Sequence, residues 1–208
     1  MDTTRPKLLL VGASGAIGRP VHQALLEYYD VITASRHNAD VRLDLTDPAS
    51  VTAVLASVGP LDAIVSVAGR ANFVALKDVE PVAGDESKYA LGLQDKLMGQ
   101  VNLALASRGV IRPGGAIVLT SGTTAVDPIL GGSSLSMVNG ALEAWVRAAA
   151  TEWPDAVRIN LVSPSLVEGT PAEAIKAFPG WPIITGEQLG LAYIRCLRSG
   201  ITGQTVTI

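Results

Sequence analysis

The feature that most constrains this chain is an apolar run near its start that ends in closely spaced glycines. Residues 8–11 are aliphatic, and Gly12, Gly15 and Gly18 follow at once. Such a run predicts a buried parallel strand that turns directly into a helix. The first glycine permits the tight turn, the second lets backbone N–H groups approach a pyrophosphate, and the third lets the helix pack close to the strand. The pattern predicts a dinucleotide-binding turn, with an ordinary strand-to-helix turn as the alternative.

The turn itself supplies the first candidate cofactor contacts. At the N-terminus of the following helix, unpaired N–H groups and the helix dipole favour an anion. The candidates in the turn are Gly12, Ser14, Gly15, Ala16 and Ile17.

Composition narrows the class of protein. The chain has 208 residues, of which 48% are hydrophobic, and it has no run of eighteen apolar residues, so we expect no membrane span. A net charge of −3 without a basic cluster makes nucleic acid an unexpected partner. The single Cys196 cannot form an internal disulfide, and His22 and His37 stand apart from any ligand cluster, so we expect no metal site.

The N-terminus imitates one targeting signal. Arg5 and Lys7 precede the apolar run as basic residues precede the core of a secretory signal peptide. Three glycines in the segment and the lack of a small-residue cleavage pattern argue against that interpretation. We expect a cytoplasmic protein.

Aliphatic strands alternate with amphipathic helices along the whole chain. The strands are expected at residues 8–11, 30–34, 41–45, 61–67, 115–120, 157–162 and 204–208. Between them, helices are expected at residues 17–29, from Asp47 and Pro48 onward, and at residues 85–108, 135–153 and 188–198. This alternation predicts one α/β domain over residues 1–208, a single-domain Rossmann fold with a doubly wound parallel sheet of about seven strands and helices on both faces.

The residues after the second strand indicate which dinucleotide binds. An NAD-binding turn usually places Asp or Glu there for the ribose 2′-hydroxyl, whereas an Arg accommodates the 2′-phosphate of NADP. Here Ser35 and Arg36 follow the strand, and Arg36 can pair with a phosphate bidentately. NADP(H) is therefore favoured over NAD(H). The alternative is that Arg36 is an ordinary solvated side chain.

Several ordered motifs make the chain resemble the short-chain dehydrogenase/reductase family over nearly its whole length. They are VGASGAIG at 11–18, LDLTD at 43–47, VSVAG at 65–69, VNL at 101–103, GAIVLTSG at 115–122 and RINLVSPSLVEGT at 158–170. The resemblance implies an NAD(P)-dependent oxidoreductase that acts on a small carbonyl or alcohol. It also implies further cofactor contacts at Asp44, Leu45, Val67, Ala68, Gly69, Thr120, Asn139, Pro164, Val167 and Thr170.

The main departure from the family lies in its catalytic residues. The family pairs a Tyr, which transfers the proton, with a Lys four residues later, which lowers the pKa of that Tyr. In this sequence Leu135 and Asn139 stand at those positions. The family Ser falls at Gly122, or at Ser121 if the loop shifts by one residue, and Asn102 in VNL matches the family Asn. The catalytic candidates are therefore Asn102 and Ser121.

Three hypotheses about function remain open. The first is an NADP(H)-dependent oxidoreductase of atypical mechanism, and the second is a non-catalytic NADP(H)-binding redox sensor or scaffold. The third is a purely structural oligomer subunit that binds no dinucleotide. By resemblance, the helices that begin at Asp85 and Leu135 form the family's usual subunit contact, which implies a homodimer or homotetramer.

Overall fold

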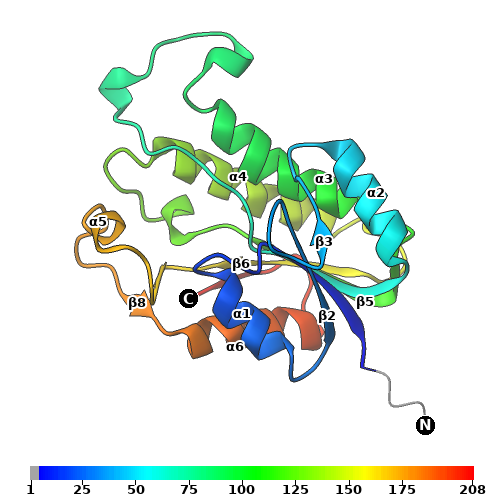
Figure 1. Cartoon of the computed structure of the whole chain (residues 1–208). Helices are drawn as coiled ribbons and strands as arrows, with labels where there is room; N and C mark the ends of the chain where they lie inside the picture. Colours follow the sequence, from blue (N-terminus) through cyan, green and yellow to red (C-terminus); the bar gives the residue numbers. More distant parts are fainter. Residues whose placement is uncertain (1–4) are drawn as a thin grey trace.

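Seven parallel strands form a central sheet between two layers of helices in the computed structural model, which describes residues 5–208 (Figure 1). The strand order is β3-β2-β1-β4-β5-β6-β9, so the chain moves outward in one direction and then returns past β1 to build the other half. The strands are β1 (Lys7–Val11), β2 (Asp30–Ser35), β3 (Val41–Arg42), β4 (Leu61–Ser66), β5 (Ile111–Thr120), β6 (Arg158–Ser163) and β9 (Thr205–Thr207). The expected doubly wound parallel sheet is confirmed.

Each face of the sheet is covered by its own set of helices (Figure 1). One layer holds α1 (Gly18–Leu25) and α6 (Gly186–Arg198), and the other holds α2 (Pro48–Val58), α3 (Gly99–Ala106) and α4 (Ser133–Ala149). Strand β1 shows why two layers are needed. Its residues Leu8 and Leu10 belong to the apolar cluster under α1 and α6, whereas Leu9 and Val11 belong to the cluster on the opposite face. Side chains alternate between the faces of a strand, so a strand that is apolar throughout must be buried on both sides.

Local capping fixes the start of two helices. The carboxylate of Asp47 accepts a hydrogen bond from the Ala49 N–H, and Pro48 occupies the first turn of α2, as the sequence predicts. At α6, Thr185 and Gln188 form a capping box in which each side chain accepts from the backbone N–H of the other. Pro48 and Gly186 thus begin helices directly beside the carboxyl edge of the sheet.

The prediction of a helix at residues 85–108 is wrong for the first turn. Residues Gly84–Glu86 form a separate 3₁₀ turn (η2), and Ser87 then has an extended backbone. The Ser87 hydroxyl accepts from the Tyr89 N–H, so the helix begins afresh at residue 90. Its first part, η3 (Gly92–Met98), is a π-helix that continues into α3. A π-helix has wider turns than an α-helix and therefore presents different side chains to the sheet.

The third strand is shorter than the expected range 41–45. It ends at Arg42, because Asp44 accepts hydrogen bonds from the backbone N–H and the hydroxyl of Thr46 and so makes a turn instead. The other elements start or end within a few residues of their expected bounds, and β5 begins four residues earlier than expected.

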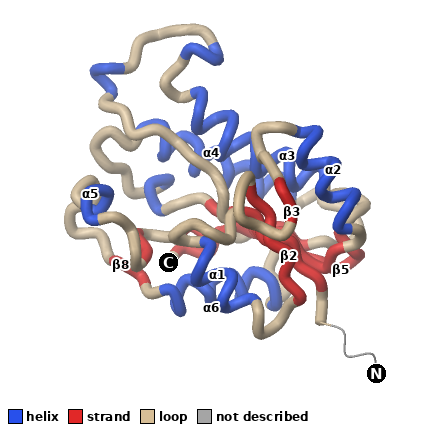
Figure 2. The backbone as a smooth tube through the Cα atoms, viewed as in Figure 1, coloured by secondary structure: helices blue, strands red, loops and turns tan. Residues whose placement is uncertain are grey.

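The long loops lie on one side of the molecule (Figure 2). The segment after β6 holds structure that the sequence analysis did not predict, since β7 (Leu166–Val167) pairs in parallel with β8 (Ile183–Ile184). A short helix, α5 (Ala172–Ile175), lies between them. Among residues 5–208, no helix is long and apolar enough to cross a membrane.

Candidate functional site

A cavity of about 240 Å³ lies at the carboxyl ends of β1, β2 and β4, where the strand order reverses. We call it the turn cavity. It is lined by Val11, Gly12, Ser14, Gly15, Ser35, Arg36, Leu43, Asp44, Leu45, Val67, Ala68, Gly69, Arg70 and Asp95. In open α/β sheets this crevice is where ligands bind. Ten of the residues expected to contact a cofactor line it: Gly12, Ser14, Gly15, Ser35, Arg36, Asp44, Leu45, Val67, Ala68 and Gly69.

The three positions of the turn favour glycine for different reasons. A Cβ atom on Gly18 would lie 2.1 Å from the Gly12 carbonyl oxygen, so the first turn of α1 requires glycine there. Gly12 has φ +95° and would place a Cβ 3.0 Å from Ala68. A Cβ on Gly15 would meet only the Gly12 oxygen, at 3.7 Å, so no close contact within the protein excludes a side chain there. The space beside Gly15 belongs to the turn cavity, and it fits a ligand that approaches the backbone closely.

The tip of β2 supplies the positive end of the turn cavity. Ser35 is committed to a local turn, since its hydroxyl donates to the His37 carbonyl and accepts from the His37 N–H. Arg36 is exposed, and among residues 5–208 it has no ion-pair or hydrogen-bond partner. Its guanidinium is therefore available to an anion at this end of the cavity.

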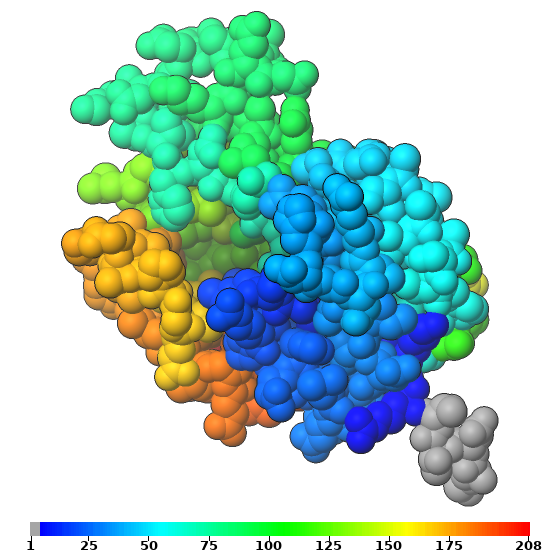
Figure 3. All heavy atoms as spheres, in the orientation of Figure 1, coloured from blue at the N-terminus to red at the C-terminus, as the bar shows by residue number. Residues whose placement is uncertain are grey.

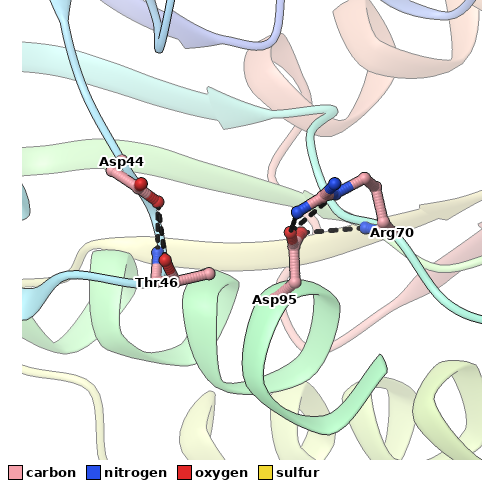
Figure 4. A network of polar contacts seen from close by, with 4 residues as sticks. All are labelled: Asp44, Thr46, Arg70 and Asp95. Atoms are coloured by element: carbon pink, nitrogen blue, oxygen red, sulfur yellow. Dashed lines mark hydrogen bonds and ion pairs between the residues drawn. The ribbon is translucent and has the colours of Figure 1, made fainter. Parts of the chain in front are cut away.

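The two carboxylates of the turn cavity are engaged by neighbouring groups (Figure 4). Asp44 accepts from the Thr46 N–H at 2.9 Å and from its hydroxyl at 2.7 Å, and these hydrogen bonds lower the pKa of the Asp44 carboxyl. Asp95 on η3 accepts from the backbone N–H and Nε of Arg70 and pairs with its Nη2, each at 2.9 Å. Because Arg70 compensates the charge of Asp95, that carboxylate repels an anionic ligand less than a free one would.

A second cavity of about 140 Å³ lies beside the ends of β5 and β6. We call it the aromatic cavity, because Phe73, Phe178 and Trp181 form part of its wall. It is lined by Ile17, Phe73, Lys96, Ser121, Gly122, Thr123, Thr124, Leu135, Asn139, Pro164, Ser165, Leu166, Phe178 and Trp181. Phe178 contacts Phe73 and Trp181 edge to face, with ring centroids 6.1 and 5.1 Å apart. In the space-filling view the surface is hollowed between the orange segment near residue 175, the blue turn and the green loops (Figure 3).

Six residues singled out from the sequence meet in the aromatic cavity: Ile17, Ser121, Gly122, Leu135, Asn139 and Pro164. The Ser121 hydroxyl donates to Glu143 at 3.0 Å, and the same oxygen of Glu143 accepts from Ser163. Asn139 is buried, and its Nδ2 donates to Thr124 at 2.7 Å, while its Oδ1 is buried without a partner in the described structure. That Oδ1 can accept a hydrogen bond from a ligand hydroxyl.

Gly122 makes room for Asn139. A Cβ on Gly122 would lie 2.9 Å from the Asn139 Nδ2, which is too close for an ordinary contact. A serine at position 122 would therefore displace Asn139, so glycine at one position and asparagine at the other fit together.

Lys96 also lines this site, although the sequence analysis did not single it out. It lies on η3, and its side chain passes over Gly69, where a Cβ would come within 2.8 Å of the Lys96 Cγ. Its Nζ donates to the Ser121 carbonyl oxygen at 3.0 Å, and burial lowers the pKa of the amine to about 8. Gly69 lines the turn cavity and Lys96 lines the aromatic cavity, so the lysine stem marks the boundary between them.

Five of the predicted site residues line neither cavity: Ala16, Asn102, Thr120, Val167 and Thr170. Asn102 lies half-buried on α3, after the π-helix that carries Lys96. Thr120 is buried in the sheet, where its hydroxyl contacts the Ser66 carbonyl and the Tyr193 hydroxyl, each at 2.6 Å. The structure does not bring these five side chains to the site, and their roles stay predictions.

A glycine turn at the switch point of a parallel sheet defines a dinucleotide-binding type of fold. A family model described as Enoyl-(Acyl carrier protein) reductase matches residues 19–184. L-xylulose reductase from Homo sapiens is 30% identical over 190 residues, which cover 83% of this chain and 76% of that protein. The chain belongs to the short-chain dehydrogenase/reductase family.

Solved structures agree with this assignment. Protein lin1944 from Listeria innocua matches with a TM-score of 0.92 and 36% identity, covering 98% of this chain and 99% of that chain. A short chain dehydrogenase from Burkholderia cenocepacia J2315, solved in complex with NADP, has the same fold with a TM-score of 0.83 and 21% identity. The match covers 99% of this chain and 96% of that chain.

Proposed function

We propose that this protein is an NADP(H)-dependent oxidoreductase that reduces a small carbonyl compound or oxidises the corresponding alcohol. The observation that carries the proposal is the adjacency of two cavities, one fitted to a dinucleotide and the other to a small apolar molecule. The aromatic cavity has room for a compact substrate, and its aromatic wall favours an apolar body over a charged one.

The residues of the turn cavity fit a nicotinamide dinucleotide phosphate. In this proposal the backbone around Gly12 and Gly15 holds the pyrophosphate, and Arg36 pairs with the 2′-phosphate. Asn139 offers its free Oδ1 to a ribose hydroxyl. The nicotinamide, when bound, supplies or accepts the hydride, and the protein contributes orientation and charge.

The mechanism that we propose is atypical. The family enzymes transfer the proton through a Tyr–Lys pair, whereas Leu135 offers no proton at all and Asn139 carries no charge. Both residues lie in the wall of the aromatic cavity. Positioning of the reactants therefore carries a large share of the catalysis, because a fixed geometry alone accelerates a reaction strongly.

A second candidate function is a non-catalytic NADP(H)-binding sensor or scaffold. The replacement of both proton-transfer residues favours it, since holding a dinucleotide does not require a group that transfers a proton.

The experiment that separates these functions is a titration with NADPH and NADH by calorimetry, followed by assays with NADPH and a panel of aliphatic and aromatic aldehydes and ketones. We expect tighter binding of NADPH than of NADH, and consumption of NADPH with at least one carbonyl compound. Tight binding without turnover across the panel would support the sensor. Failure to bind either dinucleotide would reject both functions.

We also propose a cytoplasmic homodimer or homotetramer. Met98 at the end of η3 and Met137 on α4 are 44% and 39% exposed, and a subunit contact through these helices would cover them. Light scattering after gel filtration gives the oligomeric state.

A further inference from the structure

We propose that Lys96 is the proton donor of this enzyme: its ammonium group protonates the carbonyl oxygen of a substrate in the aromatic cavity, and its amine accepts the proton in the reverse direction. The inference rests on the proposed oxidoreductase function and adds to it the residue that moves the proton.

The backbone around Lys96 aims its side chain at the site. Lys96 lies in the middle of the π-helix η3 (Gly92–Met98), and the side chain passes directly over Gly69, which has φ +137°. A side chain at residue 69 would collide with the lysine stem. Its nitrogen reaches the end of β5, where it contacts the Ser121 carbonyl, and the residue lines the aromatic cavity. Both the wide helical turn and the glycine thus place the amine between the two cavities.

The residues of the aromatic cavity that the sequence analysis singled out are less suited to give a proton. The single hydroxyl proton of Ser121 is donated to Glu143. The Asn139 amide donates to Thr124, and an amide does not ionise near neutral pH. Leu135, which takes the place of the family Tyr, has no proton to transfer. Lys96 is the basic side chain in the wall of this cavity.

The hydrogen bonds of Lys96 leave it free to act. An ammonium group has three N–H donors, and within the described residues one acceptor is present, the Ser121 carbonyl oxygen. Two donors therefore remain for a substrate oxygen or water. The side chain is partly buried and its nitrogen is held by the Ser121 carbonyl, so a carbonyl oxygen that enters the cavity gains a hydrogen bond already oriented by the protein.

The electrostatic surroundings suit proton transfer near neutral pH. The charged groups on the neighbouring elements are Arg70 and Asp95, which pair with each other, and Glu143 on α4, which accepts from Ser121 and Ser163. Burial lowers the pKa of the Lys96 amine to about 8. Most of the amine is protonated at pH 7, yet it loses a proton far more readily than an exposed lysine does.

Reduction of the substrate carbonyl needs one hydride and one proton. The carbonyl carbon receives a hydride, hence two electrons, from the reduced nicotinamide of the proposed function. One Nζ–H bond of Lys96 breaks, an O–H bond forms on the substrate, and the lysine becomes neutral. Solvent that reaches the cavity then returns a proton to the amine. In the oxidation, the neutral amine takes the hydroxyl proton, and the hydride would leave the alcohol carbon for the oxidised dinucleotide of the proposed function.

The first test measures the amine without any turnover. The chain has five lysines, so the ε-methylene signals of protein labelled with 13C-lysine form a simple NMR spectrum. We expect one signal to titrate near pH 8 and to be absent in Lys96→Met. A Lys96 signal that titrates above pH 10 would overturn the proposal, because such an amine would resemble an exposed one.

The second test uses the same variant in catalysis, with NADPH and the carbonyl compound that the wild type reduces fastest. Methionine keeps the length of the stem over Gly69 but has no proton to give. We expect Lys96→Met to bind NADPH within about threefold of the wild type and to lose about 100-fold or more in kcat. Lys77→Met, an exposed lysine away from both cavities, is the matched control and keeps full activity.

The pH profile completes the test. The wild-type kcat for reduction falls as the pH rises through about 8, and kcat for oxidation rises there, because the two directions need opposite protonation states. If Lys96→Met keeps most of its kcat in an enzyme that turns over, the role of Lys96 is overturned and the oxidoreductase stands. If the wild type binds NADPH but reduces nothing, the oxidoreductase itself fails, and the role of Lys96 with it.

Discussion

Replacing Lys96 by methionine is expected to stabilise the folded protein at pH 7. Burial lowers the pKa of this amine from 10.5 to about 8. Each pKa unit corresponds to about 1.36 kcal/mol, so the folded state bears a cost of about 3 kcal/mol for holding the charged amine. Methionine removes the charge but also the hydrogen bond to the Ser121 carbonyl, which is worth about 1 kcal/mol. The net gain in the free energy of unfolding is about 2 kcal/mol, or roughly 4–8 °C in Tm.

The stability difference between Lys96→Met and the wild type is expected to change with pH. Below pH 8 the lysine is charged in both the folded and the unfolded chain, and the cost is complete. As the pH rises from about 8 to 10.5, the folded lysine loses its proton while the unfolded one keeps it, so the cost disappears and the wild type gains stability relative to the variant. Near pH 10.5 only the lost hydrogen bond remains, and Lys96→Met becomes the less stable protein.

Urea denaturation followed by tryptophan fluorescence measures the free energy of unfolding of the wild type and of Lys96→Met at pH 7 and at pH 10.5. Lys77→Met is the control for removing an exposed charge. A variant less stable than the wild type at pH 7, or a stability difference that does not change between pH 7 and 10.5, would refute the assignment of a buried charged amine to Lys96.

Three further predictions concern the cofactor and the core. Arg36→Ala weakens NADPH binding by about tenfold or more and NADH binding little, in calorimetry, because only NADPH carries the phosphate; equal losses would remove Arg36 from that role. Gly15→Ala keeps the wild-type Tm but weakens NADPH binding about tenfold. Gly18→Ala costs about 3 kcal/mol of stability, because its Cβ would lie only 2.1 Å from the Gly12 carbonyl oxygen; Gly140→Ala, with open space around it, neither lowers the stability nor weakens NADPH binding. The Cys196 thiol is buried and its pKa is raised to about 12, so a thiol reagent at pH 8 reacts with it only after denaturation; rapid labelling of the native protein would contradict the packing under α6.

The sheet could be predicted from the sequence because its strands are continuous aliphatic runs bounded by turn residues. The same reasoning located the glycine turn, the Asp47 cap and the cavity residues that follow the strands, since each depends on a local pattern. The residues of the site could be predicted because they follow strands whose carboxyl ends lie at one edge of the sheet.

The π-helix was not recognised, although its signal is present. Tyr89, Leu93, Leu97, Val101 and Leu105 recur every four residues. Four residues advance an α-helix by about 400°, so such a stripe drifts about 40° at each step, and these five side chains could not stay on one face of a straight α-helix. A wider turn removes part of that drift. The regular spacing of four indicates a local π-helix better than it indicates a long α-helix.

Lys96 was beyond sequence reasoning because its importance comes from what surrounds it. Between Asp95 and Leu97 a lysine reads as a solvated side chain. Its burial depends on Gly69 and Ser121, which follow two other strands, and only the folded chain brings the three together. Asn102, chosen by its motif, lies after the π-helix and reaches neither cavity.

The edge-to-face contact between Phe73 and Phe178 has a kinetic consequence. The two rings come from the loops after β4 and β6 and both line the aromatic cavity, so a molecule that enters between them must separate them. Such a contact is worth about 1 kcal/mol, which corresponds to a closed-to-open ratio of about five to one. Loops of this kind move in nanoseconds to microseconds, far faster than the usual enzymatic turnover of about 1–1000 per second. Separation of the two rings is therefore too fast to set the rate of turnover.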